Sequence, residues 1–85
     1  MLGYFAEINR LGKFIEKNLL KSTGREFLCI PYVEMSEAGL VVFCECEVIY
    51  KASFAADDKL GKFCAKTESE VTKAVNTYLK SDLAA

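Results

Sequence analysis

The start of the chain alternates apolar and polar residues with the period of an amphipathic helix. At about 100° per residue, one arc of such a helix holds only apolar side chains. These are Tyr4, Ile8, Leu11, Ile15 and Leu19, with Phe5 beside them. Ser22 and Thr23 then precede Gly24, which can adopt the left-handed conformation that ends many helices. The pattern therefore predicts a helix over residues 3–21.

Two segments that follow have the composition and the alternation of β-strands, residues 26–34 and residues 40–51. Between them, Met35–Gly39 has the composition of a turn and ends in glycine. A turn of this length sets Glu34 opposite Leu40, and one face of the hairpin then becomes apolar throughout. Its side chains are Leu28, Ile30, Tyr32, Val42, Cys44, Cys46, Val48 and Tyr50. We predict that this face packs on the core, because a slip of one residue would reverse both faces.

The opposite face of this predicted hairpin is also largely apolar. It carries Phe27, Cys29, Pro31, Val33, Val41, Phe43 and Ile49, with Glu26, Glu45, Glu47 and Lys51 around them. If both terminal helices cover the core face, this second face is exposed, and so large an apolar area is typical of an interface. Alternatively, the helices divide between the two faces, or residues 52–66 fold over the second one. Pro31 cannot donate a sheet hydrogen bond, which predicts that the first strand lies at an edge.

Residues 52–66 have two interpretations. In the first, the second strand continues to Ala56, a turn spans Asp57–Gly61, and a third strand spans Lys62–Lys66. In the second, the segment is a helix that places Ala56, Leu60, Phe63 and Cys64 on one side. Glycine is unfavourable inside a helix and common in turns, so Gly61 favours the first interpretation.

The last part of the chain predicts a second helix. Thr67 and Glu70 form a capping box, with Thr67 as the N-cap, and apolar residues recur on one side as far as about Ser81. The order of elements is then α-β-β-β-α, with α-β-β-α-α as the alternative. We expect one α+β domain over residues 1–85, in which a small antiparallel meander of two or three strands packs against the N- and C-terminal helices.

Length and composition agree with a small globular domain. The chain has 85 residues, of which 52% are hydrophobic and 27% are charged, enough for a single core. Its uncharged runs are too short to span a bilayer, and Glu7 and Arg10 interrupt the apolar start that a signal peptide would need. We therefore expect a cytoplasmic protein that makes no membrane contact and keeps its cysteines as thiols.

Charge is distributed unevenly although the net charge is only −1. Residues 1–25 carry five basic and two acidic side chains, whereas residues 26–50 carry five glutamates and no lysine or arginine. The basic side chains lie opposite the apolar arc of the first helix, and they are a candidate anion-binding stripe. The members of the stripe are Arg10, Lys13, Lys17, Lys21 and Arg25. Such a stripe suits a phosphate backbone or an acidic protein, although many solvent-facing helices have one.

Catalytic and metal-binding signatures are weak. The chain has no histidine, so the usual base for a serine or cysteine nucleophile is missing. Its cysteines, Cys29, Cys44, Cys46 and Cys64, do not have the paired spacing of zinc sites and suit buried thiols. The carboxylate pairs Glu45/Glu47 and Asp57/Asp58 are typical of solvated surface. We expect no enzyme activity, no metal and no cofactor.

The exposed face of the hairpin thus predicts function best. We expect a non-enzymatic protein-interaction module, such as a small adaptor, inhibitor or chaperone-like protein, which forms a homodimer or binds another protein. The interface residues we predict are Phe27, Val33, Val41, Phe43, Glu45, Glu47 and Ile49. The alternative is a nucleic-acid-binding module that uses the basic stripe.

Overall fold

The computed structural model describes residues 5–55 and 60–84, which fold in the order α-β-β-β-α. The elements are α1 (Phe5–Thr23), β1 (Leu28–Val33), β2 (Glu37–Cys44), β3 (Glu47–Ala55) and α2 (Leu60–Ala84). The strands form one antiparallel sheet in the order β1-β2-β3. The predicted α+β class and the predicted order of elements are therefore confirmed.

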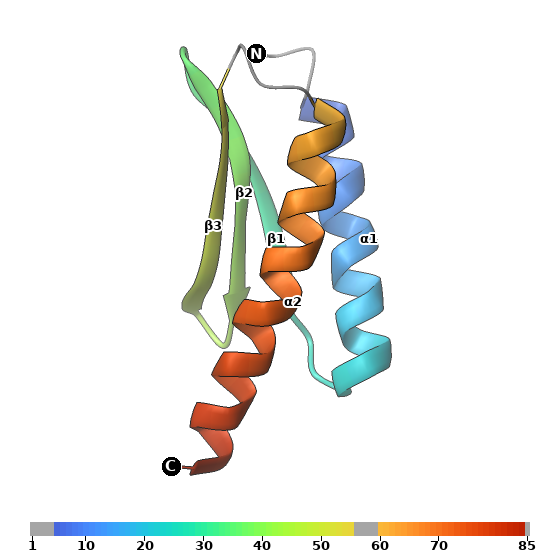
Figure 1. Ribbon diagram of the computed structural model, residues 1–85, viewed down its shortest axis with the longest axis vertical. Helices are drawn as coiled ribbons and strands as arrows, with labels where there is room; N and C mark the ends of the chain where they lie inside the picture. Colours follow the sequence, from blue (N-terminus) through green and yellow to red (C-terminus); the bar gives the residue numbers. More distant parts are fainter. Residues whose placement is uncertain (1–4, 56–59, 85) are drawn as a thin grey trace.

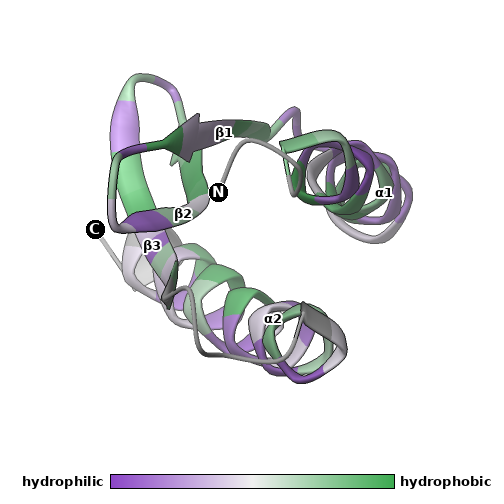
Figure 2. Ribbon diagram, turned by 90° about the horizontal axis from the view of Figure 1, so that it is seen from above, coloured by the Kyte–Doolittle hydropathy of each residue, from purple (hydrophilic) through white to green (hydrophobic). Residues whose placement is uncertain are grey.

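The molecule has two layers, because α1 and α2 both lie on one side of the sheet (Figures 1 and 2). Helix α1 packs mainly against β1, and α2 packs against β3. One cluster of buried side chains fills the space between the layers. Helix α1 contributes Ile8, Leu11, Ile15 and Leu19, the sheet contributes Leu40, Val42 and Phe54 among others, and α2 contributes Phe63, Val71 and Val75. Within residues 5–55 and 60–84, no helix covers the opposite face of the sheet (Figure 2).

Helix α1 agrees with its predicted pattern. The apolar arc is buried from Ile8 to Leu19, whereas Tyr4 lies outside the described residues. Gly24 has φ +74°, and its N–H donates to the carbonyl of Leu20 at 2.9 Å, as in an αL C-cap. Thr23 strengthens this end, because its hydroxyl bonds the Leu19 carbonyl and accepts the Arg25 N–H. Glycine can adopt this positive φ without strain, which explains why the helix ends here.

The first hairpin differs from the prediction in its turn. Only Glu34, Met35 and Ser36 separate the strands, and the N–H of Glu34 donates to the carbonyl of Glu37 at 2.7 Å. Val33 therefore pairs with Ala38, a shift of three residues from the predicted register. Because an odd shift exchanges the two faces of a strand, the predicted core face was wrong for β1, whereas Val42 and Cys44 of β2 are buried as predicted. In β1 it is Cys29 that is buried, at 3% exposed.

The predicted strand over residues 40–51 is in fact two strands. Glu45 and Cys46 have φ values of 52° and 68°, and they form the tight two-residue turn between β2 and β3. The predicted third strand over Lys62–Lys66 was also wrong, since these residues belong to α2. The predicted turn at Asp57–Gly61 falls partly outside the described residues, and Gly61 lies in α2.

Helix α2 begins before the predicted capping box. Thr67 is not an N-cap but a buried residue within the helix, 1% exposed. The reason is burial of the preceding turn, in which Phe63 packs against Phe54 with ring centroids 5.2 Å apart. Phe63, Thr67, Val71 and Val75 follow one another at intervals of four residues and form one buried stripe. Packing of this stripe outweighs the local capping signal, and the helical interpretation of residues 60–66 was the correct one.

A hydrogen bond from the Tyr50 hydroxyl to the Glu70 carboxylate ties β3 to α2. Burial, together with this bond and the charge of Glu70, raises the pKa of Tyr50 from 10.0 to about 12. Between these pH values the unfolded chain loses the tyrosine proton while the folded chain keeps it. The stabilisation that Tyr50 contributes is therefore fully present below pH 10 and is lost as the pH rises towards 12.

We expect the urea midpoint of unfolding to decrease when the pH is raised from below to above pH 10, and to decrease more in the unmodified protein than in Tyr50→Phe. An equal fall in both proteins would contradict this role of Tyr50.

Neither helix of the described ranges, 5–55 and 60–84, is long and apolar enough to cross a membrane.

Candidate functional site

The face of the sheet that points away from the helices carries an exposed apolar patch. Leu28 is 52% exposed, Ile30 is 44% exposed and Val48 is 55% exposed, and the half-buried Val41 and Phe43 lie among them. Leu28 pairs with Phe43, Ile30 pairs with Val41, and Phe43 pairs with Val48 across the strands. We call these five residues, Leu28, Ile30, Val41, Phe43 and Val48, the outer patch. Because they are cross-strand neighbours, their side chains lie next to one another on one face of the sheet.

Beyond the outer patch, towards the β1–β2 turn, Tyr32 covers the same face. Its partner Gly39 has no side chain, so the Tyr32 ring lies across β2 and its hydroxyl donates to the Ala52 carbonyl at 3.4 Å. The Lys51 ammonium lies 5.1 Å from the centre of the ring, on its face. This end of the sheet is therefore polar at its surface, and the exposed apolar area is concentrated near the β2–β3 turn.

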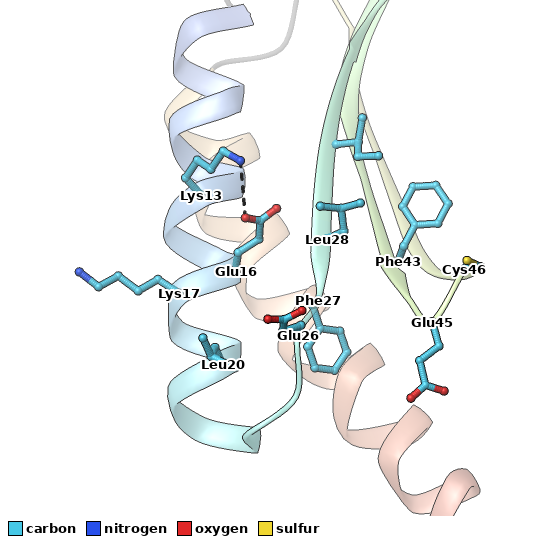
Figure 3. A pocket seen from close by; sticks show the side chains of 11 residues that line it. Lys13, Glu16, Lys17, Leu20, Glu26, Phe27, Leu28, Phe43, Glu45 and Cys46 are labelled. Carbon is cyan, nitrogen blue, oxygen red and sulfur yellow. Dashed lines mark ion pairs between the residues drawn. The ribbon is translucent and has the colours of Figure 1, made fainter.

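A groove of about 810 Å³ continues the outer patch around β1 to the exposed side of α1. Its apolar walls are Leu20, Phe27, Leu28, Ile30 and Phe43, and its charged or polar borders are Lys13, Glu16, Lys17, Glu26, Glu45 and Cys46. Figure 3 shows Lys13 and Lys17 on α1 at one side of β1, and Glu45 and Cys46 beyond Phe43 at the other side. The volume is in the range of natural binding sites, roughly 300–1,000 Å³.

The two sides of the groove differ in charge. On the α1 side, Lys13 lies 3.7 Å from Glu16, while Lys17 has no ion pair with any residue in the described ranges. On the side of the β2–β3 turn, Glu45 is exposed and likewise makes no ion pair with the described part of the chain. An apolar floor thus separates a free lysine from a free glutamate.

Strand β1 is an edge strand, as Pro31 predicted. The outward N–H of Cys29 donates to the Glu16 carboxylate at 2.7 Å. Because the N–H groups of a strand alternate in direction, the nitrogen of Pro31 points to the same free edge, where it has no hydrogen to donate. Glu16 and Pro31 together disfavour the addition of another strand at this edge.

The structure brings only part of the predicted interface together. Val41 and Phe43 do lie in the outer patch, and Glu45 and Glu47 are exposed at or beside the β2–β3 turn. Phe27 is buried at 5% exposed, and Val33 and Ile49 pack against the core, so their predicted place on the exposed face of the hairpin was wrong. The register shift explains Phe27 and Val33. Ile49 is the unpaired residue of a bulge, since Val42 pairs with Tyr50 while Phe43 pairs with Val48.

Leu28, Ile30 and Val48 are members of the outer patch that the sequence placed on the core face. Gly39 was the signal that could have found Leu28 and Ile30, because glycine inside a strand often accompanies an aromatic residue that crosses it. Pairing Gly39 with Tyr32 gives the observed register and reverses the two faces of β1. Val48 joins the outer patch because the turn at Glu45 and Cys46 pairs it with Phe43. Leu20 was missed as well, since it lies on α1 outside the buried arc and only the fold brings it to the groove.

The candidate anion-binding stripe is exposed on α1 for four of its five members, Arg10, Lys13, Lys17 and Lys21. Arg10 forms an ion pair with Glu7 at 3.0 Å, and Lys13 is close to Glu16. Arg25, beyond the helix, is only partly exposed. The two carboxylates reduce the positive charge that the stripe presents to an anion.

The cysteines are free thiols with different environments. Cys29 and Cys44 are buried, Cys64 is partly exposed, and Cys46 is exposed in the β2–β3 turn rather than on the core face where the sequence placed it. Burial and the nearby Glu16 raise the pKa of Cys29 to about 12, which makes a thiolate there unfavourable. Within residues 5–55 and 60–84, no three cysteine or carboxylate side chains converge on a possible metal position.

Comparison of the chain with protein-family models, with curated proteins and with solved structures found no match.

Proposed function

We propose that this chain is a non-enzymatic protein-interaction module that acts as a homodimer joined through the outer patch. The observation that carries the proposal is the exposure of Leu28, Ile30 and Val48 on a sheet face that neither helix covers. Together with Val41 and Phe43 they form a contiguous apolar area supplied by all of the strands. Monomeric domains rarely expose such an area, because association or aggregation would bury it.

The surroundings of the outer patch support a specific interface. Charged side chains border its apolar centre, with Glu45 at the turn, Lys51 along β3 and Glu26 beside the groove. An apolar centre with a charged rim is the usual anatomy of an interface, and a central aromatic residue such as Phe43 often contributes most of the binding free energy.

A second copy of the chain is the partner that charge and geometry favour. A net charge of −1 produces little long-range repulsion between two copies. Twofold homodimers are the commonest assemblies of soluble proteins, and they need a surface that is complementary to itself. The outer patch meets this requirement, because apolar side chains can oppose apolar side chains in any face-to-face arrangement.

Sedimentation equilibrium of the unmodified chain tests the proposal. We expect the mass of two chains at high protein concentration, with dissociation on dilution. The mass of one chain at every accessible concentration would contradict self-association. In that case, a complex of defined stoichiometry with another protein would still support a protein-interaction module, although not a homodimer.

Nucleic-acid binding through the basic stripe is the second candidate function, because four of the stripe's side chains are exposed along α1. The ion pairs of Arg10 and Lys13 with neighbouring glutamates make it the weaker candidate. An oligonucleotide affinity that falls steeply with salt, and that Lys17→Glu weakens while Phe43→Glu does not, would favour this alternative.

A further inference from the structure

The outer patch alone is small for a stable dimer. With strands about 4.8 Å apart and a rise of about 3.4 Å per residue, three strands of eight residues cover roughly 400 Å² of flat area. A specific interface buries about 800 Å² on each partner. A dimer joined through the outer patch therefore has to include adjacent surface, and the groove beside α1 is the adjacent surface that is apolar.

Groove and outer patch together form a surface with charge of opposite sign on its two sides. Lys17, on α1, borders one side, and Glu45, in the β2–β3 turn, borders the other, with Leu28 and Phe43 between them (Figure 3). Both charges are exposed, and neither has an ion pair within the described ranges. Each is thus available to a partner.

A twofold axis matches these two sides to each other. When two copies meet face to face, the twofold axis lies in the plane of contact. Rotation by 180° about this axis exchanges the two sides of the surface, so each side of one copy meets the opposite side of the second copy. An axis that runs between α1 and the turn brings Lys17 of each copy towards Glu45 of the other. The same contact occurs twice, and like charges are kept apart.

From this arrangement we infer that reciprocal ion pairs, Lys17 with Glu45 of the second copy, align the dimer across the outer patch and the groove. The inference rests on the proposed homodimer and adds its register and its specificity-determining residues. Apolar contact supplies most of the affinity, while the paired charges select this orientation among the face-to-face arrangements that apolar contact alone allows.

Charge reversal tests the pairing. We expect Lys17→Glu alone and Glu45→Lys alone each to weaken the dimer about tenfold at low salt, because each change replaces two attractions with two repulsions. The double variant, which exchanges the two charges, should return to within about threefold of the unmodified dimer. Lys21→Glu and Glu34→Lys make the same changes outside the groove and should shift the dissociation constant by less than about twofold.

The outcomes separate this inference from the proposal on which it rests. A monomeric unmodified chain overturns the homodimer itself. A dimer that Phe43→Glu dissociates, but that neither single charge reversal weakens, overturns only the ion pairs. Single reversals whose effects persist in the double variant also overturn the pairing, because the two residues then act independently.

Discussion

Phe43→Glu should convert the homodimer into a monomer, with a dissociation constant roughly 100-fold higher or more. Phe43 lies at the centre of the outer patch and pairs with Leu28 on one side and Val48 on the other. A glutamate there would be buried without a partner in the dimer, whereas in the monomer it would be solvated. Sedimentation velocity over a dilution series measures the shift.

Matched variants distinguish loss of the interface from loss of the fold. Leu28→Glu should have the same effect at less cost to the sheet, because Leu28 is already 52% exposed. Phe14→Glu is the control, since Phe14 is 53% exposed on α1 and does not line the groove. If Phe14→Glu dissociates the dimer and the two outer-patch variants do not, the interface lies on the helices instead.

Gly39→Ala should destabilise the monomer fold by about 3 kcal/mol and lower the melting temperature by roughly 10 °C or more. A Cβ atom at position 39 would lie 2.0 Å from the Ala52 carbonyl oxygen and 2.7 Å from the Tyr32 ring and hydroxyl. The carbonyl belongs to the sheet backbone and cannot move freely. The Tyr32 ring would have to leave β2, which breaks its hydrogen bond to Ala52 and its contact with Lys51.

Gly61→Ala is the matched control for this substitution. Gly61 lies at the start of α2, and a Cβ atom there would have no neighbour within 4 Å. Alanine is the better helix former, so this variant should be as stable as the unmodified protein or more stable by up to about 1 kcal/mol. Thermal unfolding followed by circular dichroism compares the two. Equal melting temperatures for Gly39→Ala and the unmodified protein would contradict the packing of Tyr32 over Gly39.

Periodicity predicted the helix α1 well because its pattern repeats over several turns. Ile8, Leu11, Ile15 and Leu19 are spaced by three or four residues, polar side chains occupy the other side, and Gly24 marks the end. No single residue decides such a pattern, so the helix and its buried face follow directly from the sequence.

The faces of the sheet could not be predicted in the same way. Residues 27–33 are apolar on both sides of the strand, so no polar residue marks the one that faces solvent. The predicted register therefore depended on the length assumed for the turn. That length was too long, because glycine is typical of turns and Gly39 was counted in the turn although it lies within β2. Glu45 and Cys46 form a turn without the Asn-Gly sequence that usually announces one.

Tertiary contacts explain the remaining differences. Thr67 stands at the N-cap position of a capping-box sequence, but packing of Phe63 on Phe54 extends α2 towards the N-terminus beyond Thr67. Glu16 looks like an ordinary surface residue of α1, and only the fold places it against the Cys29 N–H at the edge of β1. The groove likewise depends on elements distant in the sequence, so its borders are a property of the fold.

Intermolecular contacts measured by isotope-filtered NMR test the homodimer through the outer patch most directly. In a sample that mixes labelled and unlabelled chains, the Phe43 ring of one chain should show nuclear Overhauser effects to methyl groups of the other. The methyl groups expected are those of Leu28, Ile30, Val41 and Val48. Intermolecular effects confined to the helices, or none at concentrations where the chain sediments as a dimer, would contradict an interface at the outer patch.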